Sequence, residues 1–476
     1  MDATTILSLS VAELAGLYRS RSLSPVEVVN ASLARIEALN ARYNAFVLVD
    51  GPGALRQAEA AEALFASDVE PPPLAGIPVS VKDNIFTAGM RSTSGSLLFR
   101  DHVPDEDSGV VAAARQAGAI VVGKTNTPAF GWAGFTDNMI FGPTRNPWNP
   151  DLTPGGSSGG AAVSVATGMV PLAIGTDGGG SLRTPAAFTG TVGFKPSHGR
   201  LSDTPLHPHW LLQHYGPIAR NVGDVAYFLD AAAGPHPDDP HSLPAYDGSF
   251  VDDCRQDLAP RVVFTTQLGW VDTVDPEIAE ACRSVVAELS ASGWPVEEKD
   301  DLGWTDPALF ATVLSIVGFS HRLRDYRHRT DEIEPGILAM LENADRLPPN
   351  AFYDAYLARN AWCSHPLRLF QSTDLLITPT LAAPPFAIGT MAPELIGGKP
   401  VPPSAWNPYL RAFNLTGQPA ISVPIGFTRA GLPIGLHIVG GHHRDGQVLA
   451  AAAKVQKLRP AKTWSADAQA WRKNHN

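Results

Sequence analysis

After residue 70, short apolar runs alternate with segments of helical periodicity, and this alternation limits the fold more than any other feature of the sequence. The apolar runs are LAGIPVSV (74–81), AIVVG (119–123) and VPLAIG (170–175), and the helical segments include SGVVAAARQAG (108–118) and GGAAVSVATG (159–168). The apolar runs return near residue 375 in DLLITPT, AISVPIGF and GLPIGLHIVG. Strands that alternate with helices form a sheet covered by helices on both faces. We therefore predict an α/β fold with a mixed, mostly parallel central sheet.

Two helical regions accompany this pattern. The first 65 residues contain two capping boxes, Ser10 to Glu13 and Ser24 to Glu27, and apolar residues recur at helical spacing after the second. Residues 300–365 are mainly helical and more charged. We predict an N-terminal helical segment (1–65) packed on the core and one large domain (66–476), within which residues 300–365 form a helical cap subregion.

Composition and charge exclude several classes of protein. The 476 residues carry a net charge of -11 and no run of Lys and Arg, so nucleic acid is not expected as a partner. The uncharged stretch 152–176 contains prolines and many glycines, which argues against a membrane-spanning helix. The chain starts with an acidic residue instead of the basic region of an export signal, and its cysteines, Cys254, Cys282 and Cys363, are odd in number and widely spaced. We expect a cytoplasmic protein with neither a membrane partner nor a disulfide framework.

The histidines give no indication of a metal site. His207 and His209 in PLHPHW, and the pair His442 and His443, lack the spacing of zinc ligands, and no carboxylates cluster beside them in the sequence. We expect exposed loop histidines, no metal and no cofactor.

Two glycine-rich blocks surround serine residues: TPGGSSGGAA (153–162) and GTDGGGSLRTPAAFTG (175–190). Glycine loops bind phosphate groups in many enzymes, but neither block contains GxxxxGK[ST] or a GxGxxG that follows a strand. Residues 155–159 spell the GxSxG of a nucleophile elbow around Ser157, yet NPWNPDLTP has three prolines where that motif needs a strand. A third interpretation is that both blocks are tight turns that need small residues. Each block taken alone leaves these interpretations open.

Lys82 stands at the end of an apolar strand, LAGIPVSVK, between alternating apolar neighbours. Burial disfavours the charged ammonium and lowers the pKa of a lysine. To be half neutral near pH 7, Lys82 needs a pKa about 3 units below its usual value, which corresponds to roughly 4 kcal/mol of differential desolvation. Such a lysine acts as a base.

Seven motifs together identify a family. They are GIPVSVKDN, GKTNTPAFGW, FGPTRNPWNP, TPGGSSGGAA, GTDGGGSLRTPAAFTG, VGFKPSHGR and FNLTGQPAISVP. With them the chain resembles the amidase signature family, densely over residues 74–225 and more loosely over 375–440. The resemblance implies an α/β sandwich that hydrolyses amide C–N bonds through a triad of a serine, a serine in cis configuration and a lysine.

The resemblance assigns the triad to particular residues. Ser181 corresponds to the nucleophile, Ser157 to the serine in cis configuration and Lys82 to the base, while Ser158 corresponds to a supporting hydroxyl. By the same resemblance Asp177 and Arg183 hold the second glycine loop.

The glycines before Ser181 are expected to form an oxyanion hole. The backbone N–H groups of Gly178, Gly179, Gly180 and Ser181 are the candidate donors, because Cβ atoms there would crowd the bound carbonyl and forbid some of the required dihedrals. Gly178 stands where the family usually has threonine or another larger residue, which affects substrate preference rather than the chemistry.

The resemblance also suggests residues of the substrate pocket. Gly131 corresponds to a position whose carbonyl faces the substrate, flanked by Phe130 and Trp132. Further loop aromatics are Trp210, His214 and Tyr215 after the core motifs, and Trp406 and Tyr409 in the Pro-rich segment 381–406 and just after it. Aromatic residues in loops often bind ligands. We expect Gly131, Trp132, Trp210 and Trp406 to bind an apolar or aromatic part of the substrate.

The expected function is hydrolysis of a carboxylic amide through a serine acyl-enzyme, which releases an acid and an amine or ammonia. The segment after GKTN is TPAFGWAGFTDN, as in free-standing amidases, whereas the amidase subunit of amidotransferases usually has an acidic, methionine-containing version. The alternatives are an amidase-like subunit of an amidotransferase complex and a hydrolase that prefers carbamates or esters. The expected partner is a small amide substrate, and a homodimer is left open.

Overall fold

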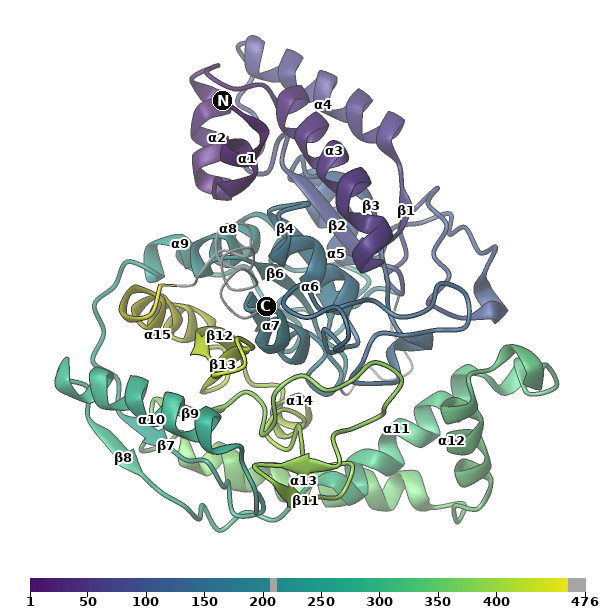
Figure 1. Cartoon of the computed structure of the whole chain (residues 1–476), viewed down its shortest axis with the longest axis vertical. Coiled ribbons are helices and arrows are strands. Elements are labelled where there is room, and N and C mark those ends of the chain that lie inside the picture. Colours follow the sequence, from purple (N-terminus) through teal and green to yellow (C-terminus); the bar gives the residue numbers. More distant parts are fainter. Residues whose placement is uncertain (206–211, 461–476) are drawn as a thin grey trace.

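The computed structural model describes residues 1–205 and 212–460, and Figure 1 shows their arrangement around one long sheet. In the described residues this sheet has eleven strands in the spatial order β1-β3-β2-β4-β6-β5-β12-β13-β9-β7-β8. The strands are β1 (Phe46–Val49), β2 (Pro78–Lys82), β3 (Ile120–Thr125), β4 (Leu172–Thr176), β5 (Val192–Lys195), β6 (Tyr215–Ala219), β7 (Val262–Phe264), β8 (Val296–Glu298), β9 (Leu375–Pro379), β12 (Ala420–Phe427) and β13 (Pro433–Gly440). A separate two-stranded ribbon pairs β10 (Leu395–Ile396) with β11 (Lys399–Pro400).

The sheet is mixed, as predicted, and its parallel pairings lie in two blocks. β2 pairs in parallel with β3 and β4, and β7 pairs in parallel with β8 and β9. The six other pairings of the long sheet are antiparallel. The predicted parallel character therefore holds around the alternating strands and helices of residues 78–176. Residues 428–432 are too few for a crossover, so β12 and β13 pair antiparallel.

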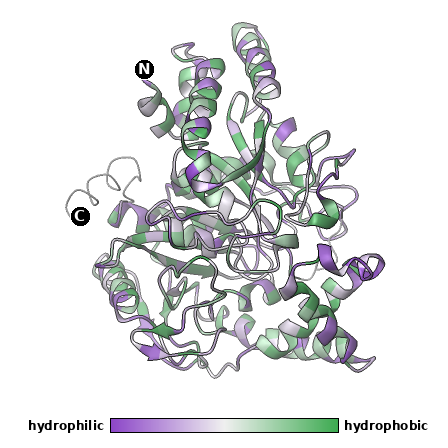
Figure 2. Ribbon diagram, turned by 45° about the vertical axis from the view of Figure 1, so that its right-hand side comes forward, coloured by the Kyte–Doolittle hydropathy of each residue, from purple (hydrophilic) through white to green (hydrophobic). Residues whose placement is uncertain are grey.

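Helices cover both faces of the sheet. One face carries α6 (Gly159–Ala166) and α7 (Arg183–Thr189), and the other carries α5 (Gly109–Gln116), α8 (Val222–Ala232), α10 (Pro276–Ala291) and α15 (Asp445–Leu458). Successive residues of β3 point to opposite faces, so Val121 packs in the cluster that contains α8, and Val122 packs in the cluster that contains α6. Figure 2 shows hydrophobic residues along the central strands, while hydrophobic and hydrophilic residues alternate along the outer helices. The predicted helix-covered sheet is confirmed.

The N-terminal residues form four helices and one strand of the long sheet. The helices are α1 (Ala3–Ser8), α2 (Val11–Arg19), α3 (Pro25–Tyr43) and α4 (Gly51–Ala66). Both predicted capping boxes are present, at Ser10 before α2 and at Ser24 before α3. Because β1 pairs with β3 at the end of the sheet, this region is joined to the core by backbone hydrogen bonds as well as by packing. The division at residue 65 stays a prediction.

Three helices occupy most of residues 300–369. They are α11 (Ala308–Arg322), α12 (Pro335–Asp345) and α13 (Ala351–Leu369), and Figure 1 shows α11 and α12 projecting to one side of the sheet. Their apolar residues, among them Phe319, Ile337 and Leu341, pack on Ala129 and Phe130 of the short helix η2 (Ala129–Gly131). The remaining short helices are α9 (Phe250–Asp253), α14 (Ala412–Thr416), η1 (Leu97–Phe99), η3 (Arg324–Tyr326) and η4 (Thr330–Glu332). Among the described residues, no helix combines the length and the apolar character that crossing a membrane requires.

Candidate active site

Lys82 ends β2, which lies between β3 and β4, and its side chain is completely buried. Its Nζ lies 2.6 Å from Ser157 Oγ and 2.7 Å from Thr176 Oγ1. Burial lowers the pKa of Lys82 well below its ordinary value of 10.5, and the nearby carboxylate of Asp177 opposes this shift only in part. The amine is thus held in contact with two hydroxyl groups in an environment that favours its neutral form.

Thr176 is a candidate site residue that the sequence did not reveal. It ends β4, the strand that runs parallel to β2, so the last residues of both strands meet at the same edge of the sheet. The signal that could have revealed it is its place directly before Asp177 and the three glycines, at the end of an apolar run. Its hydroxyl and that of Ser157 are the two hydrogen-bond partners of Lys82 Nζ among the described residues.

Ser158, which directly follows Ser157, connects the two glycine-rich blocks. The peptide bond between Gly156 and Ser157 is cis. The backbone N–H of Ser158 donates to the carbonyl of Ser181 over 3.2 Å, and the Ser158 hydroxyl donates to the carbonyl of Thr176 over 3.1 Å. The supporting position predicted for Ser158 therefore corresponds to two hydrogen bonds that hold the first block against the second.

The loop before Ser181 offers backbone donors, but one glycine differs from the others. Among the described residues, the N–H groups of Gly178, Gly179 and Ser181 have no hydrogen-bond acceptor. The N–H of Gly180 instead donates to Asp177 Oδ1 over 2.7 Å. The prediction that Gly180 is an oxyanion donor is therefore wrong, because the carboxylate already occupies its hydrogen.

The requirement for glycine also differs along the loop. Gly180 has φ +120° and a Cβ there would lie 2.5 Å from Leu410 Cδ1, so a side chain is excluded. A Cβ on Gly178 would meet only Gln213 Oε1, at 3.5 Å, which is an ordinary contact. The predicted dihedral constraint thus applies to Gly180 and not to Gly178, where the missing side chain widens the cavity.

A buried ion pair holds the loop in place. Asp177 accepts two hydrogen bonds from Arg183, Nε to Oδ2 and Nη2 to Oδ1, each 2.9 Å long. Asn414 Nδ2 donates to Asp177 Oδ1 over 2.9 Å and to its carbonyl over 2.7 Å. Burial acts to raise the pKa of Asp177, but the guanidinium of Arg183 outweighs it and the pKa lies below the ordinary value. Asp177 and Arg183 thus contact each other and the loop and do not line the cavity; their role in holding the loop stays a prediction.

Ser157, Ser181 and the glycine loop line one cavity of about 380 Å³. Gly131 and Trp132 also line it, and a Cβ on Gly131 would be 3.0 Å from Ser157 Oγ. The other described residues that line it are Asn84, Phe130, Ala133, Gly134, Gly156, Thr176, Thr184, Leu212, Gln213, Thr312, Ser315, Ile316, Phe319, Met340, Asn343, Asn407 and Arg411. Residues of α11 and α12 thus line the cavity together with the glycine loop.

Two of the aromatic residues predicted for the pocket belong to the core instead. Trp406 is buried against Phe188 and Phe386, with ring centroids at 5.9 and 5.1 Å, and lies behind Gly134. The Tyr409 hydroxyl donates to the carbonyl of Thr266 over 2.7 Å. The prediction that Trp406 binds substrate is wrong, because this loop turns the indole into the core, where it does not line the cavity. Its neighbour Asn407 lines the cavity.

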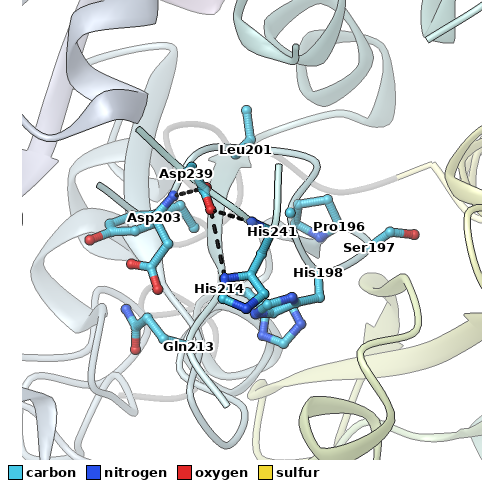
Figure 3. Close-up of a pocket in the computed structure, with 11 residues that line it drawn as sticks. Pro196, Ser197, His198, Leu201, Asp203, Gln213, His214, Asp239 and His241 are labelled. Carbon is cyan, nitrogen blue, oxygen red and sulfur yellow. Dashed lines mark hydrogen bonds and ion pairs between the residues drawn. The ribbon is translucent and has the colours of Figure 1, made fainter. Parts of the chain in front are cut away.

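A second, much smaller cavity of about 10 Å³ adjoins the first, and Gln213 lines both. Figure 3 shows His214 and His241 turned toward it, with Asp239 accepting from the backbone N–H groups of Asp203 and His241. Its volume suffices for about one water molecule. His214 and Tyr215, predicted as pocket candidates, line this small cavity and not the large one.

The other predicted positions give a mixed result. His442 and His443 are exposed, as predicted, and His442 Nε2 lies 2.6 Å from the carbonyl of Thr416. In the described part of the chain, no three His, Cys, Asp or Glu residues are grouped so that they could hold a metal ion. His207, His209 and Trp210 lie outside the described residues.

Comparison with known proteins identifies the family. The family model named Amidase matches residues 27–449. The chain belongs to the amidase family. This amidase is 34% identical over 459 residues to the acylamidase of Rhodococcus erythropolis, a match that covers 95% of this chain and 96% of that protein. It is an enzyme that hydrolyses the C–N bond of carboxylic amides.

Other relatives of the amidase have different names. A glutamyl-tRNA(Gln) amidotransferase subunit of Carboxydothermus hydrogenoformans is 32% identical over 471 residues, covering 93% of this chain and 96% of that protein. Among solved structures, a bacterial aryl acylamidase of the amidase signature enzymes has a TM-score of 0.89 at 30% identity, covering 97% of this chain and 98% of that one. The 6-aminohexanoate cyclic dimer hydrolase with bound substrate has a TM-score of 0.87 at 30% identity, covering 95% and 98%.

Proposed function

We propose that this chain is a stand-alone amidase in which Ser181 attacks the amide carbonyl, Ser157 transfers the proton and Lys82 is the base. One observation carries this proposal: a completely buried lysine amine lies 2.6 Å from Ser157 Oγ at a cavity that Ser181 also lines. A neutral amine can accept a proton, and burial favours that form of Lys82.

In the first half of the reaction, the proton of Ser181 moves to Ser157 Oγ while the proton of Ser157 moves to Lys82 Nζ. Ser181 Oγ then forms a bond to the amide carbon, and the carbonyl oxygen takes the negative charge. The N–H groups of Gly178, Gly179 and Ser181 have no acceptor among the described residues and are free to bind this oxyanion. One such donor contributes about 3 to 4 kcal/mol to the stability of a transition state.

In the second half, the proton returns along the same groups to the leaving nitrogen. The C–N bond breaks, the amine departs and an acyl ester remains on Ser181. Water then attacks the ester by the same proton transfers and releases the acid. Attack by Ser181 and the later attack by water each need Lys82 neutral, so activity is expected to rise with pH as Lys82 loses its proton, and to fall below its lowered pKa.

The proposed substrate contains an apolar or aromatic group. Phe130, Trp132, Ile316, Phe319 and Met340 form an apolar part of the cavity lining. Relatives named aryl acylamidase and acylamidase agree with such a group. A preference for carbamates or esters is tested by comparing them with the corresponding amides.

The relatives named as amidotransferase subunits favour the second candidate, a protein that acts only within a complex. A cytoplasmic location is likewise proposed, supported by three unpaired thiols, Cys254, Cys282 and Cys363, and is tested by cell fractionation. Whether the chain is a homodimer is measured by analytical ultracentrifugation.

The deciding experiment measures release of 4-nitroaniline from acyl 4-nitroanilides by the purified chain without other subunits. We expect turnover by the wild-type chain and its loss in Ser181→Ala. Ser32→Ala is the matched control, because Ser32 is buried in α3 outside the residues that line the cavity. Full activity of Ser181→Ala would refute the nucleophile, and turnover that appears only after partner subunits are added would favour the role within an amidotransferase complex.

A further inference from the structure

Arg411 is the only residue with a formal charge on the described wall of the large cavity. It precedes α14 and is partly buried. Its Nε lies 3.5 Å from the position that a Cβ on Gly179 would take, so the guanidinium stands beside the row of backbone donors before Ser181. A positive charge is therefore fixed within the cavity, close to the expected place of the scissile amide.

The guanidinium of Arg411 has no partner among the described residues. The guanidinium makes neither a hydrogen bond nor an ion pair there. The backbone carbonyl of Arg411 accepts hydrogen bonds from the N–H groups of Asn414 and Leu415. Arg183, in contrast, is buried in the bidentate contact with Asp177. The exposed Asp306 attracts Arg411 only at a distance beyond an ion pair. Taking a guanidinium out of water without a counter-ion costs free energy, which an anion bound in the cavity would offset.

The backbone on both sides of Arg411 is held by the same network that holds the glycine loop. The carbonyl of Leu410 accepts a hydrogen bond from Arg183 Nη1 over 3.2 Å, and Asn414 donates to Asp177. Arg411 is thus attached at both sides to residues that also position Asp177. Such attachment fixes where its side chain begins and reduces the ordering that ligand binding would require.

We propose that Arg411 binds a carboxylate of the substrate, so that the preferred amides carry an anionic group a few bonds from the scissile carbonyl. This inference rests on the proposed function, because it takes the glycine loop as the place of the scissile carbonyl. The planar guanidinium fork matches a carboxylate and forms two parallel hydrogen bonds with it. Asn407 also lines the cavity and adds an amide donor.

The substrate that fits this cavity has two unlike ends. Its carboxylate lies toward Arg411, and its apolar or aromatic group lies toward Phe130, Trp132 and Phe319. The carboxylate belongs either to the acyl part or to the amine part of the amide, since both parts extend from the same carbonyl. Amides of both kinds contain the carboxylate that Arg411 would bind, and separate substrates of each kind distinguish the two possibilities.

The test compares each anionic amide with a neutral one of similar shape. For the acyl part the pair is succinyl 4-nitroanilide and butyryl 4-nitroanilide; for the amine part it is N-benzoylglycine and N-propylbenzamide. The measured quantity is the ratio of kcat/KM for the anionic amide to kcat/KM for the neutral amide. A hydrogen-bonded charge typically changes such a ratio by about 10- to 100-fold, so we expect Arg411→Gln to lower it by this factor for one pair.

Two further variants separate charge from structure. Arg411→Lys retains the positive charge but loses the fork, and we expect an intermediate ratio. Arg429→Gln removes an exposed arginine outside the residues that line the cavity and should leave the ratio unchanged. Equal losses for the anionic and the neutral amide in Arg411→Gln, or an unchanged ratio in both pairs, would overturn the proposal.

A binding experiment keeps this test independent of turnover. Calorimetric titration of Ser181→Ala with the two anionic amides measures recognition without hydrolysis. We expect the Kd of one of them to rise at least tenfold when Arg411→Gln is added to Ser181→Ala. If the wild-type chain hydrolyses none of the amides but this difference is found, the proposed function fails and the carboxylate site stands. If neither anionic amide binds, or the Kd is the same in both variants, the carboxylate site is refuted.

Discussion

Replacing Thr176 by valine tests how Lys82 is positioned. The hydroxyl of Thr176 lies 2.7 Å from Lys82 Nζ, and the only other described contact of that nitrogen is Ser157 Oγ at 2.6 Å. Valine keeps the shape of threonine at this buried position but removes the hydrogen-bond acceptor. The amine then retains one contact, and its lone pair is no longer directed toward Ser157.

The size and the sign of two effects follow from this geometry. Loss of one net hydrogen bond costs about 1 kcal/mol, and leaving the buried N–H without an acceptor costs up to about 3 kcal/mol, so kcat/KM at its plateau should fall about 5- to 150-fold. An acceptor stabilises the ammonium more than the amine, so its removal lowers the pKa of Lys82 further. The acidic limb of the pH profile should therefore move to lower pH while the plateau falls.

The assay is kcat/KM for an acyl 4-nitroanilide as a function of pH. The matched control is Thr167→Val, because Thr167 is equally buried and its hydroxyl donates to the carbonyl of Val163 over 2.7 Å, away from Lys82. That control should keep the position of the acidic limb even where it lowers stability. A profile of Thr176→Val that superimposes on that of the wild-type chain would refute the positioning role.

Three other substitutions test the buried charges and the loop. Lys82→Met should abolish activity yet raise the free energy of unfolding at neutral pH. Between the lowered pKa of Lys82 and 10.5, the folded wild-type chain binds fewer protons than the unfolded chain, so its free energy of unfolding in urea should rise by about 1.4 kcal/mol per pH unit. The stability advantage of methionine over lysine should therefore vanish near pH 10.5. Asp177→Asn leaves Arg183 buried without its carboxylate and should lower the free energy of unfolding in urea by about 3 to 5 kcal/mol. The control Asp374→Asn, in the exposed pair with Arg261, should lower it far less, and equal losses in the two variants would contradict the argument. Gly180→Ala should lower the melting temperature clearly, because φ is +120° and Leu410 is too close, while Gly178→Ala should melt like the wild-type chain.

The sequence was sufficient to predict the sheet and the burial of Lys82, because both depend on local pattern. Lys82 ends the nearly continuous apolar run LAGIPVSV, which is typical of an inner strand, and its side chain is buried with the rest of β2. The capping boxes at Ser10 and Ser24 depend on residues three positions apart and are both present. The resemblance to known motifs then supplied Ser157 and Ser181, which spacing alone does not distinguish from turn residues.

Other features depend on contacts between distant residues and have no local pattern. Asn414 lies 237 residues after Asp177, and nothing near either residue indicates that their side chains meet. The loop sequence before Trp406 does not indicate whether the indole turns toward the cavity or, as in the structure, toward Phe188. Arg411 lies within two positions of the FNLTG motif, yet its lack of a partner is visible only when all its neighbours are known.

The role of Asp177 explains why a charged network lies directly behind a cavity whose described lining has only one charged residue. Its carboxylate binds the N–H groups of Gly180 and Leu182, which fixes the loop on both sides of Ser181. The negative charge of the same carboxylate opposes part of the lowering of the Lys82 pKa. The ion pair with Arg183 is therefore needed to neutralise the charge of Asp177. Without Arg183, the unpaired negative charge of Asp177 would favour the ammonium form of the base and oppose an oxyanion on the adjacent N–H groups. The buried ion pair therefore serves the neutrality of Lys82 as much as the shape of the loop, and a double variant, Asp177→Asn with Arg183→Gln, should recover part of the stability that either single variant loses.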